Sequence, residues 1–218
     1  MLTLVGANLN YSSWTMRAWL ALRHAGVDFR FHDVGLKTSN NWKERILSFC
    51  GAGTVPILVE GPLSIHESLA ICEYVAELYP SAQLWPADLQ LRARARAVST
   101  EMATSFVALR EAMPTNLRGR SQSTPGGPAI FHDVARVIDI WESSLAARPV
   151  GGPFLFGAFG IADCMFFPVA TRFRTYGVHL PSASASYVAA LFENEYVREL
   201  LTLAEQQPVI EQYEVFLR

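Results

Sequence analysis

Residues 54–71, which read TVPILVEGPLSIHESLAI, decide the fold of this chain. The apolar run at 55–59 is typical of a strand, and residues 63–66 form a second, shorter run after a Glu-Gly-Pro turn. Because Pro56 has no N–H for an interior ladder, it belongs at the start or the edge of its strand. The stretch therefore predicts two strands joined by a tight turn and followed directly by a helix.

Two places in this stretch offer binding chemistry. If the bond before Pro56 is cis, the backbone of Val55 turns outward and can pair with a peptide as an added strand; a trans edge proline is the structural alternative. Glu67 and Ser68 lie in the first turn of the helix predicted at 67–79, where free N–H groups converge with their side chains. Such a cluster suits the carboxylate and the ammonium of an amino acid, and a plain helix cap is the alternative.

Upstream of residue 54 the pattern is strand, helix, strand. Residues 2–7 and 29–34 are predicted strands, and apolar residues at helical spacing between them predict a helix that Gly26 ends. The tract YSSWTMR at 11–17 begins this helix. A serine there caps the helix, or presents its hydroxyl where the helix dipole favours an anion. Residues 35–53 are polar and irregular, with one helical turn predicted at 43–49.

The pattern changes near residue 80. Residues 81–88 are predicted to be a linker, and almost all apolar spacing beyond them is helical. One long amphipathic helix is predicted through residues 95–113 and another through 130–145, with a Gly- and Pro-rich loop at 115–128 between them. Further helical segments are predicted at about 161–175, 187–204 and 208–217. The second half is therefore predicted to be all-α.

Composition excludes several classes of protein. The chain has 218 residues, of which 50% are hydrophobic and 17% charged, and this excludes an intrinsically disordered protein. The net charge of −2 provides no basic excess for a nucleic acid, and no apolar stretch approaches the ~20 residues of a membrane span. The N-terminus does not resemble a secretory signal, and Cys50, Cys72 and Cys164 form no disulfide framework, so we expect a cytoplasmic protein. The five scattered histidines predict no metal site.

The order of these signals resembles the cytosolic glutathione transferases, in particular the serine-type tau, zeta and theta classes. The resemblance covers essentially the whole chain. It implies an α/β thioredoxin-like domain at residues 1–80, with the order βαβ-ββα and a mixed four-stranded sheet. It also implies a linker at 81–88 and an all-helical domain at 89–218 that contributes the electrophile pocket. Glutathione as co-substrate and a homodimer follow from the same resemblance.

In the serine-type classes a serine lies beside the glutathione sulfur. The tau- and zeta-like alignment makes this residue Ser12, which we favour, and a theta-like alignment makes it Ser13. Tyr11 is a third candidate because other classes use tyrosine. No cysteine stands at this helix start, which disfavours the omega and beta types.

The resemblance also assigns the glutathione contacts. Val55, with Pro56 cis, would bind the cysteinyl backbone of glutathione, and Glu67 and Ser68 would hold its γ-glutamyl end. The sequence departs from the family where an Asn-Pro pair and a lysine are expected, so the anchor of the glycine carboxylate stays open. Its candidates are Lys37, Trp42 and Lys43.

The electrophile pocket is implied on the first helix of the α domain. Met102, Phe106 and Arg110 lie one turn apart there, and core packing is the alternative for Met102 and Phe106. Arg110 interrupts an apolar face, and a pocket-facing arginine requires an anionic partner. Trp14, just past the serines, is expected on the same wall. Asp163 matches the family's capping box and has a predicted folding role.

The sequence thus supports a glutathione transferase in which a serine hydroxyl stabilises the thiolate for attack on a small apolar electrophile, without a metal. One alternative is a glutathione-dependent isomerase of the maleylacetoacetate type, in which Arg17 and Arg110 would bind a dicarboxylate. Trp14 stands where that type has a cysteine. The other alternative is a binding protein that keeps the fold without catalysis.

Overall fold

The computed structural model describes residues 1–35, 39–149 and 151–218. Its N-terminal half is built on a mixed sheet of four strands in the order β2-β1-β3-β4. The strands are β1 (Leu2–Gly6), β2 (Phe29–Asp33), β3 (Ile57–Glu60) and β4 (Leu63–His66). β2 runs parallel to β1, whereas β3 is antiparallel to both β1 and β4. The predicted thioredoxin-like sheet is confirmed.

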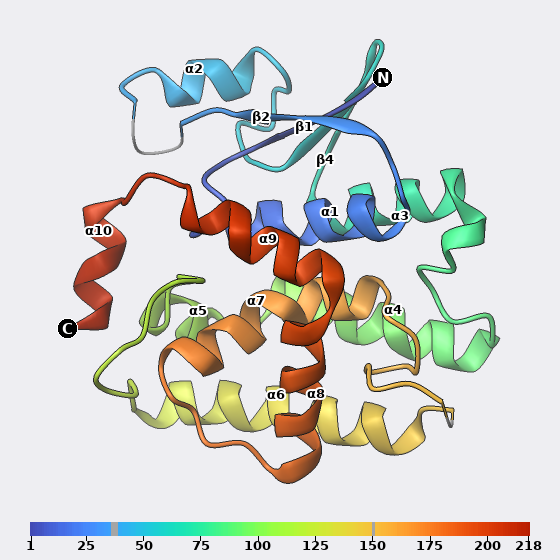
Figure 1. The fold of residues 1–218 in the computed structure, drawn as a ribbon, viewed down its shortest axis with the longest axis vertical. Coiled ribbons are helices and arrows are strands. Elements are labelled where there is room, and N and C mark those ends of the chain that lie inside the picture. The colour runs from blue at the N-terminus through green and yellow to red at the C-terminus, as the bar shows by residue number, and fades with distance from the viewer. Residues whose placement is uncertain (36–38, 150) are drawn as a thin grey trace.

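Helices cover both faces of this sheet. α1 (Ser13–His24) and α3 (Ser68–Leu78) lie on the face turned toward the C-terminal half, and α2 (Trp42–Leu47) lies on the opposite side (Figure 1). α1 is buried along most of its length, with apolar side chains such as Met16 and Leu20 fully enclosed. It is therefore the element that joins the sheet to the helical half.

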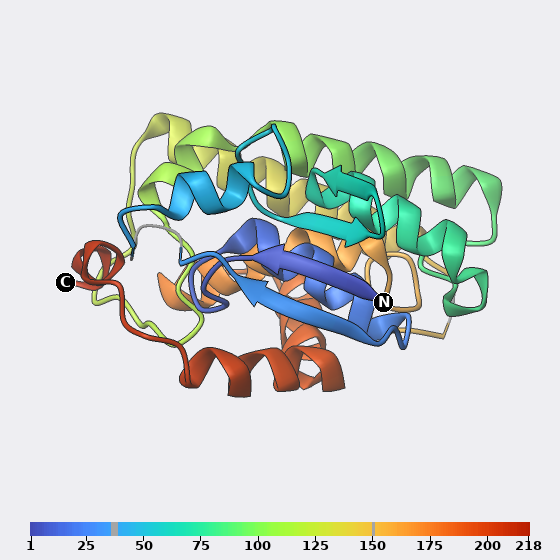
Figure 2. The ribbon, with the colours of Figure 1, turned by 90° about the horizontal axis from the view of Figure 1, so that it is seen from above.

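The C-terminal half is all-helical, as predicted. After a short 3₁₀ turn at Pro80–Ala82, its helices stack away from the sheet (Figures 1 and 2). They are α4 (Leu89–Thr104), α5 (Val107–Ala112), α6 (Pro128–Ala147), α7 (Ile161–Thr175), α8 (Ser182–Glu193), α9 (Glu195–Glu205) and α10 (Glu211–Glu214), followed by a 3₁₀ turn at Val215–Leu217. α7 packs against both α1 and α4, and one continuous apolar core contains residues of both halves.

Asp163 fixes the start of α7. Its carboxylate accepts hydrogen bonds from the backbone N–H of Gly160 at 2.9 Å and of Leu155 at 3.1 Å. The side chain is buried, and burial raises the pKa of this carboxyl to about 7, against the lowering effect of these bonds. The predicted folding role of Asp163 is confirmed.

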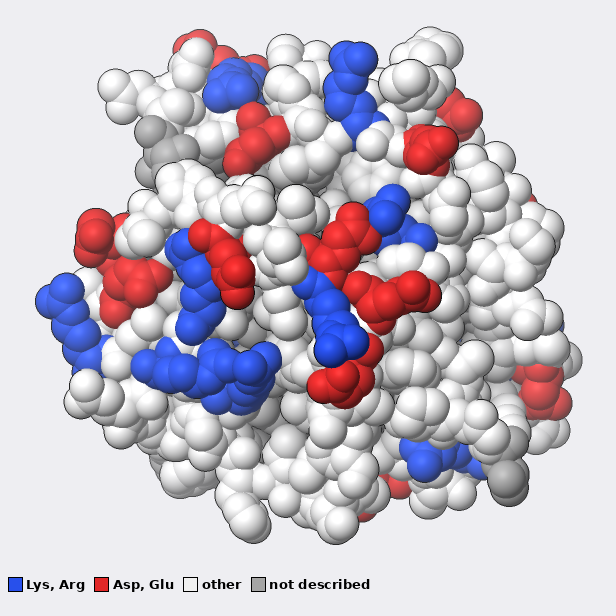
Figure 3. All heavy atoms as spheres, viewed as in Figure 1, with Lys and Arg blue, Asp and Glu red and all other residues white. Residues whose placement is uncertain are grey.

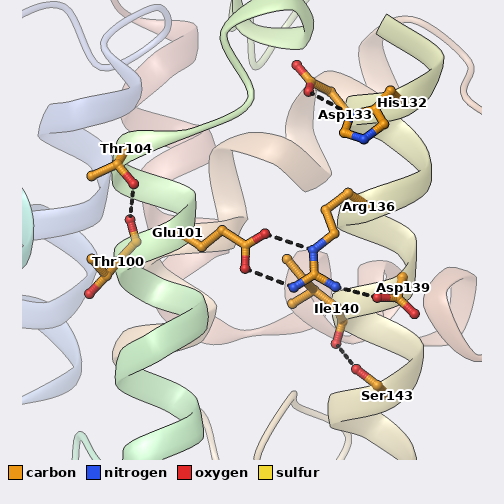
Figure 4. Close-up of polar contacts among 9 residues, drawn as sticks. All are labelled: Thr100, Glu101, Thr104, His132, Asp133, Arg136, Asp139, Ile140 and Ser143. Atoms are coloured by element: carbon orange, nitrogen blue, oxygen red, sulfur yellow. Dashed lines mark hydrogen bonds and ion pairs between the residues drawn. The ribbon is translucent and has the colours of Figure 1, made fainter. Parts of the chain in front are cut away.

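The predicted helix through residues 95–113 is wrong in one respect, because it is two helices. α4 ends at Thr104, and Phe106 has the left-handed backbone conformation (φ 61°) before α5 begins. The hydroxyls of Thr100 and Thr104 bond back to carbonyls one turn earlier, a pattern that bends helices, and Asp133 of α6 accepts from the N–H of Leu109 in α5. Figure 4 shows the Thr104–Thr100 bond.

Three other boundaries differ from the prediction. The segment at 187–204 is broken at Asn194, whose side chain caps α9 by accepting from two backbone N–H groups. The segment at 208–217 holds only α10 and a 3₁₀ turn. β3 begins at Ile57 rather than at residue 55, after a cis Val55–Pro56 bond.

The surface is mixed in charge. On the face drawn in Figure 3, positive and negative side chains are interspersed over a mostly uncharged surface. Within the described ranges, no helix combines the length and the apolar character that crossing a membrane requires.

Candidate functional site

A cavity of about 590 Å³ opens between the two halves of the molecule. It is formed by the loop before α1 and the start of α1, by α2, by the loop before β3, by α5 and the loop after it, by α7, and by the C-terminal segment. The lining residues are Tyr11, Ser12, Ser13, Trp14, Trp42, Ile46, Gly53, Thr54, Val55, Arg110, Glu111, Pro114, Thr115, Arg172, Gln212, Tyr213 and Phe216. The serine tract, Val55 and Arg110, which are far apart in sequence, thus share one cavity.

Ser12 lies at the N-terminus of α1. It is the N-cap residue, but its side chain makes no capping bond; its Oγ lies 2.7 Å from Oγ1 of Thr15 instead. Thr15 is fully buried, and its Oγ1 accepts from the backbone N–H of Ala7 at 3.2 Å. The Ser12 hydroxyl is half-buried and is held at the positive end of the α1 dipole.

The two neighbouring candidates are placed differently. Ser13 is buried, and its Oγ accepts from the guanidinium of Arg172 at 3.5 Å. The Tyr11 hydroxyl donates to the Glu214 carboxylate at 2.5 Å and accepts from Arg118 at 3.3 Å. The ring of Tyr11 therefore lines the cavity, while its hydroxyl is committed to the C-terminal segment.

The glutathione-contact candidates lie on two elements. Val55 lines the cavity, and the bond between it and the buried Pro56 is cis, as the resemblance implies. Glu67 and Ser68 are not among the residues that line the cavity; they stand together at the N-terminus of α3. Glu67 is exposed and has φ 70°, and Ser68 is 1% exposed. Among the described residues the buried Ser68 hydroxyl has no hydrogen-bond partner.

Positive charge gathers at one side of the cavity. Arg110 is half-buried, and Arg172 is 4% exposed and donates to the carbonyl of Met113 at 2.8 Å. The guanidinium of Arg110 lies 5.5 Å from the ring centre of Trp14. Burial and the charge of Arg110 lower the pKa of Arg172 to about 9. In the described part of the chain, no carboxylate forms an ion pair with either arginine, although the Arg172 guanidinium also donates to the carbonyl of Pro168 and to Ser13.

A third arginine lies behind Trp14. Arg17 is fully buried, and its guanidinium stacks 4.1 Å from the Trp14 ring centre. Its Nε donates to the carbonyl of Met165 at 3.2 Å, whereas Nη1 and Nη2 have no partner within the described ranges. Burial, followed by the charges of Arg172 and Arg110, lowers the pKa of Arg17 to about 9.

Two family models match this chain. Residues 11–78 match the glutathione S-transferase N-terminal domain, and residues 128–194 match the C-terminal domain. Together they span more than half of the sequence, and the first covers both Ser12 and Ser68. The chain belongs to the glutathione S-transferase family.

Individual members of the family show how far the likeness extends. A probable maleylacetoacetate isomerase of Caenorhabditis elegans is 35% identical over 115 residues, which are 53% of this chain and 52% of that protein. The chain spans about half or less of the length of the first curated relatives that it matches. A stringent starvation protein A homolog of Coxiella burnetii is 24% identical over 95% of this chain and 94% of its own. A Burkholderia glutathione transferase homolog, solved with bound glutathione, has a TM-score of 0.71 at 23% identity and covers 94% of this chain and 97% of its own.

Two of the residues expected to line the electrophile pocket lie in the core instead. Met102 is fully buried and Phe106 is 4% exposed, and neither is among the lining residues of the cavity. The same helical spacing suits a core-facing and a cavity-facing side chain, and both residues pack into the apolar core. Phe106 has the left-handed backbone conformation at the break between α4 and α5, and it belongs to the same core cluster. Trp14 and Arg110, by contrast, line the cavity as expected.

The remaining candidates divide in the same way. Trp42 lines the cavity, the exposed Lys43 does not, and Lys37 lies outside the described residues. Cys72 and Cys164 are fully buried, as predicted, and burial raises the pKa of the Cys72 thiol to about 12.

Among the site residues that the sequence did not predict, four bear on the chemistry or the walls of the cavity. Thr15 left no signal beyond its position one turn after Ser12, and Tyr213 and Phe216 come from a tail whose path only the fold reveals. Arg172 did leave a signal. It interrupts the apolar pattern of residues 161–175 just as Arg110 interrupts that of 95–113, and the same argument would have found it.

Proposed function

We propose that this family member is a glutathione transferase in which Ser12 stabilises the glutathione thiolate and Arg110 and Arg172 bind an anionic group of the electrophile. One observation carries the proposal: a serine hydroxyl at the start of α1, bonded only to Thr15 among the described residues, and two arginines without carboxylate partners line the same cavity. The electrophile proposed here differs from the apolar one that sequence alone favoured. The cavity does offer aromatic walls, but its arginines require a negative charge.

The hydrogen-bond chain below Ser12 supports its role. The N–H of Ala7 donates to Thr15 Oγ1, which leaves the Thr15 proton free to be donated to Ser12 Oγ. The Ser12 proton then points to the cavity and is donated to the sulfur. A donor to a charged group contributes about 1.5–3 kcal/mol, which lowers the pKa of a thiol by roughly one to two units. Ser12 is therefore a stabiliser of the thiolate and not a general base.

Glutathione itself would lie along the N-terminal half. Val55, beside the cis proline, would pair with the cysteinyl backbone of glutathione. The γ-glutamyl carboxylate would accept from the unpartnered Ser68 hydroxyl and from the N–H groups at the start of α3, and the γ-glutamyl ammonium would meet Glu67. Of the candidates for the glycine end that the structure describes, Trp42 lines the cavity and would meet that end.

A second candidate is a glutathione-dependent isomerase of a maleyl dicarboxylate. The arginines beside Trp14 favour it, because a dicarboxylate needs cationic partners, and relatives carry the names maleylacetoacetate isomerase and maleylpyruvate isomerase. In such a reaction the thiolate adds to the double bond, rotation follows, and the thiolate leaves again, so glutathione is recycled. Stoichiometry separates the two candidates, since a transferase consumes one glutathione per turnover.

A third candidate belongs to another class: a binding protein that keeps the scaffold. The match to the stringent starvation protein A homolog, which runs along nearly the whole chain, favours it. Absence of glutathione binding would support this candidate, because the hydroxyls of Ser12 and Ser68 would then form no hydrogen bonds to glutathione.

We also infer a homodimer in the cytoplasm. Leu63, Leu78 and Leu89 on β4, α3 and α4 are 42%, 43% and 70% exposed, and a second copy of the chain would cover them if these elements form the interface. Sedimentation at two concentrations would measure the assembly.

The test is turnover with paired electrophiles. We expect glutathione consumption with an electrophile that carries a carboxylate and weaker activity with its methyl ester. Ser12→Ala should retain glutathione binding and lose about 10- to 100-fold in turnover, while Ser13→Ala should lose less. Equal turnover in Ser12→Ala and wild type would remove the assignment.

A further inference from the structure

Arg17 is the buried charge that the proposed mechanism leaves unused. No part of its side chain is exposed, yet two of its three nitrogens have no partner among the described residues. A buried guanidinium ordinarily has its donors satisfied, because an unpaired buried charge is strongly destabilising. Either Arg17 binds a ligand under some condition, or its charge is stabilised by something other than hydrogen bonds.

Trp14 supplies that other stabilisation. The Arg17 guanidinium lies 4.1 Å from the centre of the indole ring, within the range in which the face of an aromatic ring attracts a cation. Trp14 lines the cavity and Arg17 does not, so the indole stands between the charge and the cavity. Arg110, which lines the cavity, places its guanidinium 5.5 Å from the centre of the same ring.

We infer that Trp14 determines specificity by covering Arg17, so that the cavity presents two arginines to an anionic substrate in place of three. This inference rests on the proposed function, because it concerns the anion that Arg110 and Arg172 bind. With the indole in place, the cavity suits one carboxylate beside a flat apolar body that packs on the ring. Without it, the Nη groups of Arg17 would reach a second carboxylate of the substrate.

The test compares two four-carbon unsaturated acids on the full-length protein saturated with glutathione. Crotonate carries one carboxylate and maleate carries two, and calorimetry gives a dissociation constant for each. In Trp14→Leu, which keeps an apolar side chain but removes the ring, we expect the preference for maleate over crotonate to rise about tenfold. In Trp14→Phe, the matched control that keeps an aromatic face, we expect the wild-type preference.

Two further variants assign the effect to Arg17. In the double variant Trp14→Leu/Arg17→Met the preference should return to the wild-type value. Arg17→Met alone should leave both affinities within about twofold, because the indole keeps Arg17 away from the ligand. Loss of binding in Arg17→Met alone would contradict the inference even if Trp14→Leu does not fold, since Arg17 would then already contact the ligand.

The failure of this inference differs from the failure of the proposed function. If wild type binds the acids and Trp14→Leu shows an unchanged preference, Trp14 does not determine specificity and the transferase proposal stands. If wild type binds neither acid in the presence of glutathione, the anionic electrophile is wrong, and the role of Trp14 is wrong with it.

Discussion

Two groups of arginines in this molecule differ in whether they have carboxylate partners. Between α4 and α6, Arg136 donates to Glu101 at 2.8 and 3.0 Å and also contacts Asp139 (Figure 4). Its carboxylate partners raise the pKa of Arg136. At the cavity wall and behind it, burial and the charges of neighbouring arginines lower the pKa of Arg172 and of Arg17 to about 9. The surface arginine is paired, and the buried ones are left without carboxylates in the described part of the chain.

The difference teaches which arginines serve folding and which serve a ligand. An exposed ion pair contributes at most about 1 kcal/mol, so the Arg136 cluster adds little to stability. Unpaired buried cations destabilise the fold, and strongly perturbed charges in a cleft are typical of functional sites. The two arginines that line the cavity, Arg110 and Arg172, are therefore best explained by an anion that binds there.

The largest expected effect is on stability, and it concerns Asp163, a buried acid whose carboxylate has hydrogen-bond partners. Its carboxyl has a folded-state pKa of about 7 against a usual 3.8, so the folded protein binds the extra proton. The stability from this proton is complete below pH 4 and is lost as the pH rises toward 7, by up to about 4 kcal/mol. Denaturant unfolding across this range should show a falling free energy in wild type and a flatter one in Asp163→Asn. Identical slopes would contradict the assignment.

The next largest effect is on catalytic activity, and it distinguishes the cavity arginine Arg110 from the surface arginine Arg136. Arg110→Met should lower kcat/KM for a carboxylate-bearing electrophile by about 10- to 100-fold, because one charged contact to the substrate is lost. The methyl ester of the same electrophile should react within about twofold of the wild-type rate. Arg136→Met is the control and should change neither. A uniform loss on both substrates would mean that Arg110 acts on folding or on glutathione.

A third effect concerns the sign of a stability change. Arg17→Met should raise the free energy of unfolding by about 1–3 kcal/mol, because an unpaired buried charge is replaced by an apolar side chain of similar length. Arg136→Met should lower it by at most about 1 kcal/mol. Both values come from denaturant unfolding. Destabilisation by Arg17→Met would show that its stacking on Trp14 outweighs its burial.

The smallest effect probes the hydroxyl chain below Ser12. Thr15→Val keeps the shape of the buried side chain and removes the donor to Ser12, so turnover should fall about three- to tenfold. Thr15→Ser retains the hydroxyl and should stay near wild type. An unchanged rate in Thr15→Val would show that the Ser12 hydroxyl orients itself without help.

Much of the fold could be predicted because its signals are local. The strand, turn and helix signals of residues 54–71 and the glycine after α1 lie within single elements, and the structure confirms the elements they predict. The breaks at Phe106 and Asn194 could not be predicted from periodicity. Both helices resume with nearly the same apolar spacing, and the decisive contact at the first break, from Asp133, comes from another helix.

The site divides along the same line. Ser12, Trp14, Val55 and Arg110 each stand at an element boundary or break an apolar pattern, and the family resemblance then placed them on the cavity. The walls formed by Tyr213 and Phe216 depend on the path of the tail. Met102 was misplaced because periodicity does not distinguish a core-facing side chain from one that faces a cavity.

The pKa of the glutathione thiol in the complex tests the central claim most directly. The ultraviolet absorbance of the thiolate, followed across pH in the saturated protein, gives this value. The Ser12 hydroxyl and the cationic cavity should both lower it, to roughly one to two units below the value of about 8.5 for a free thiol. Ser12→Ala should reverse most of that shift. A bound thiol that titrates like free glutathione would contradict the account.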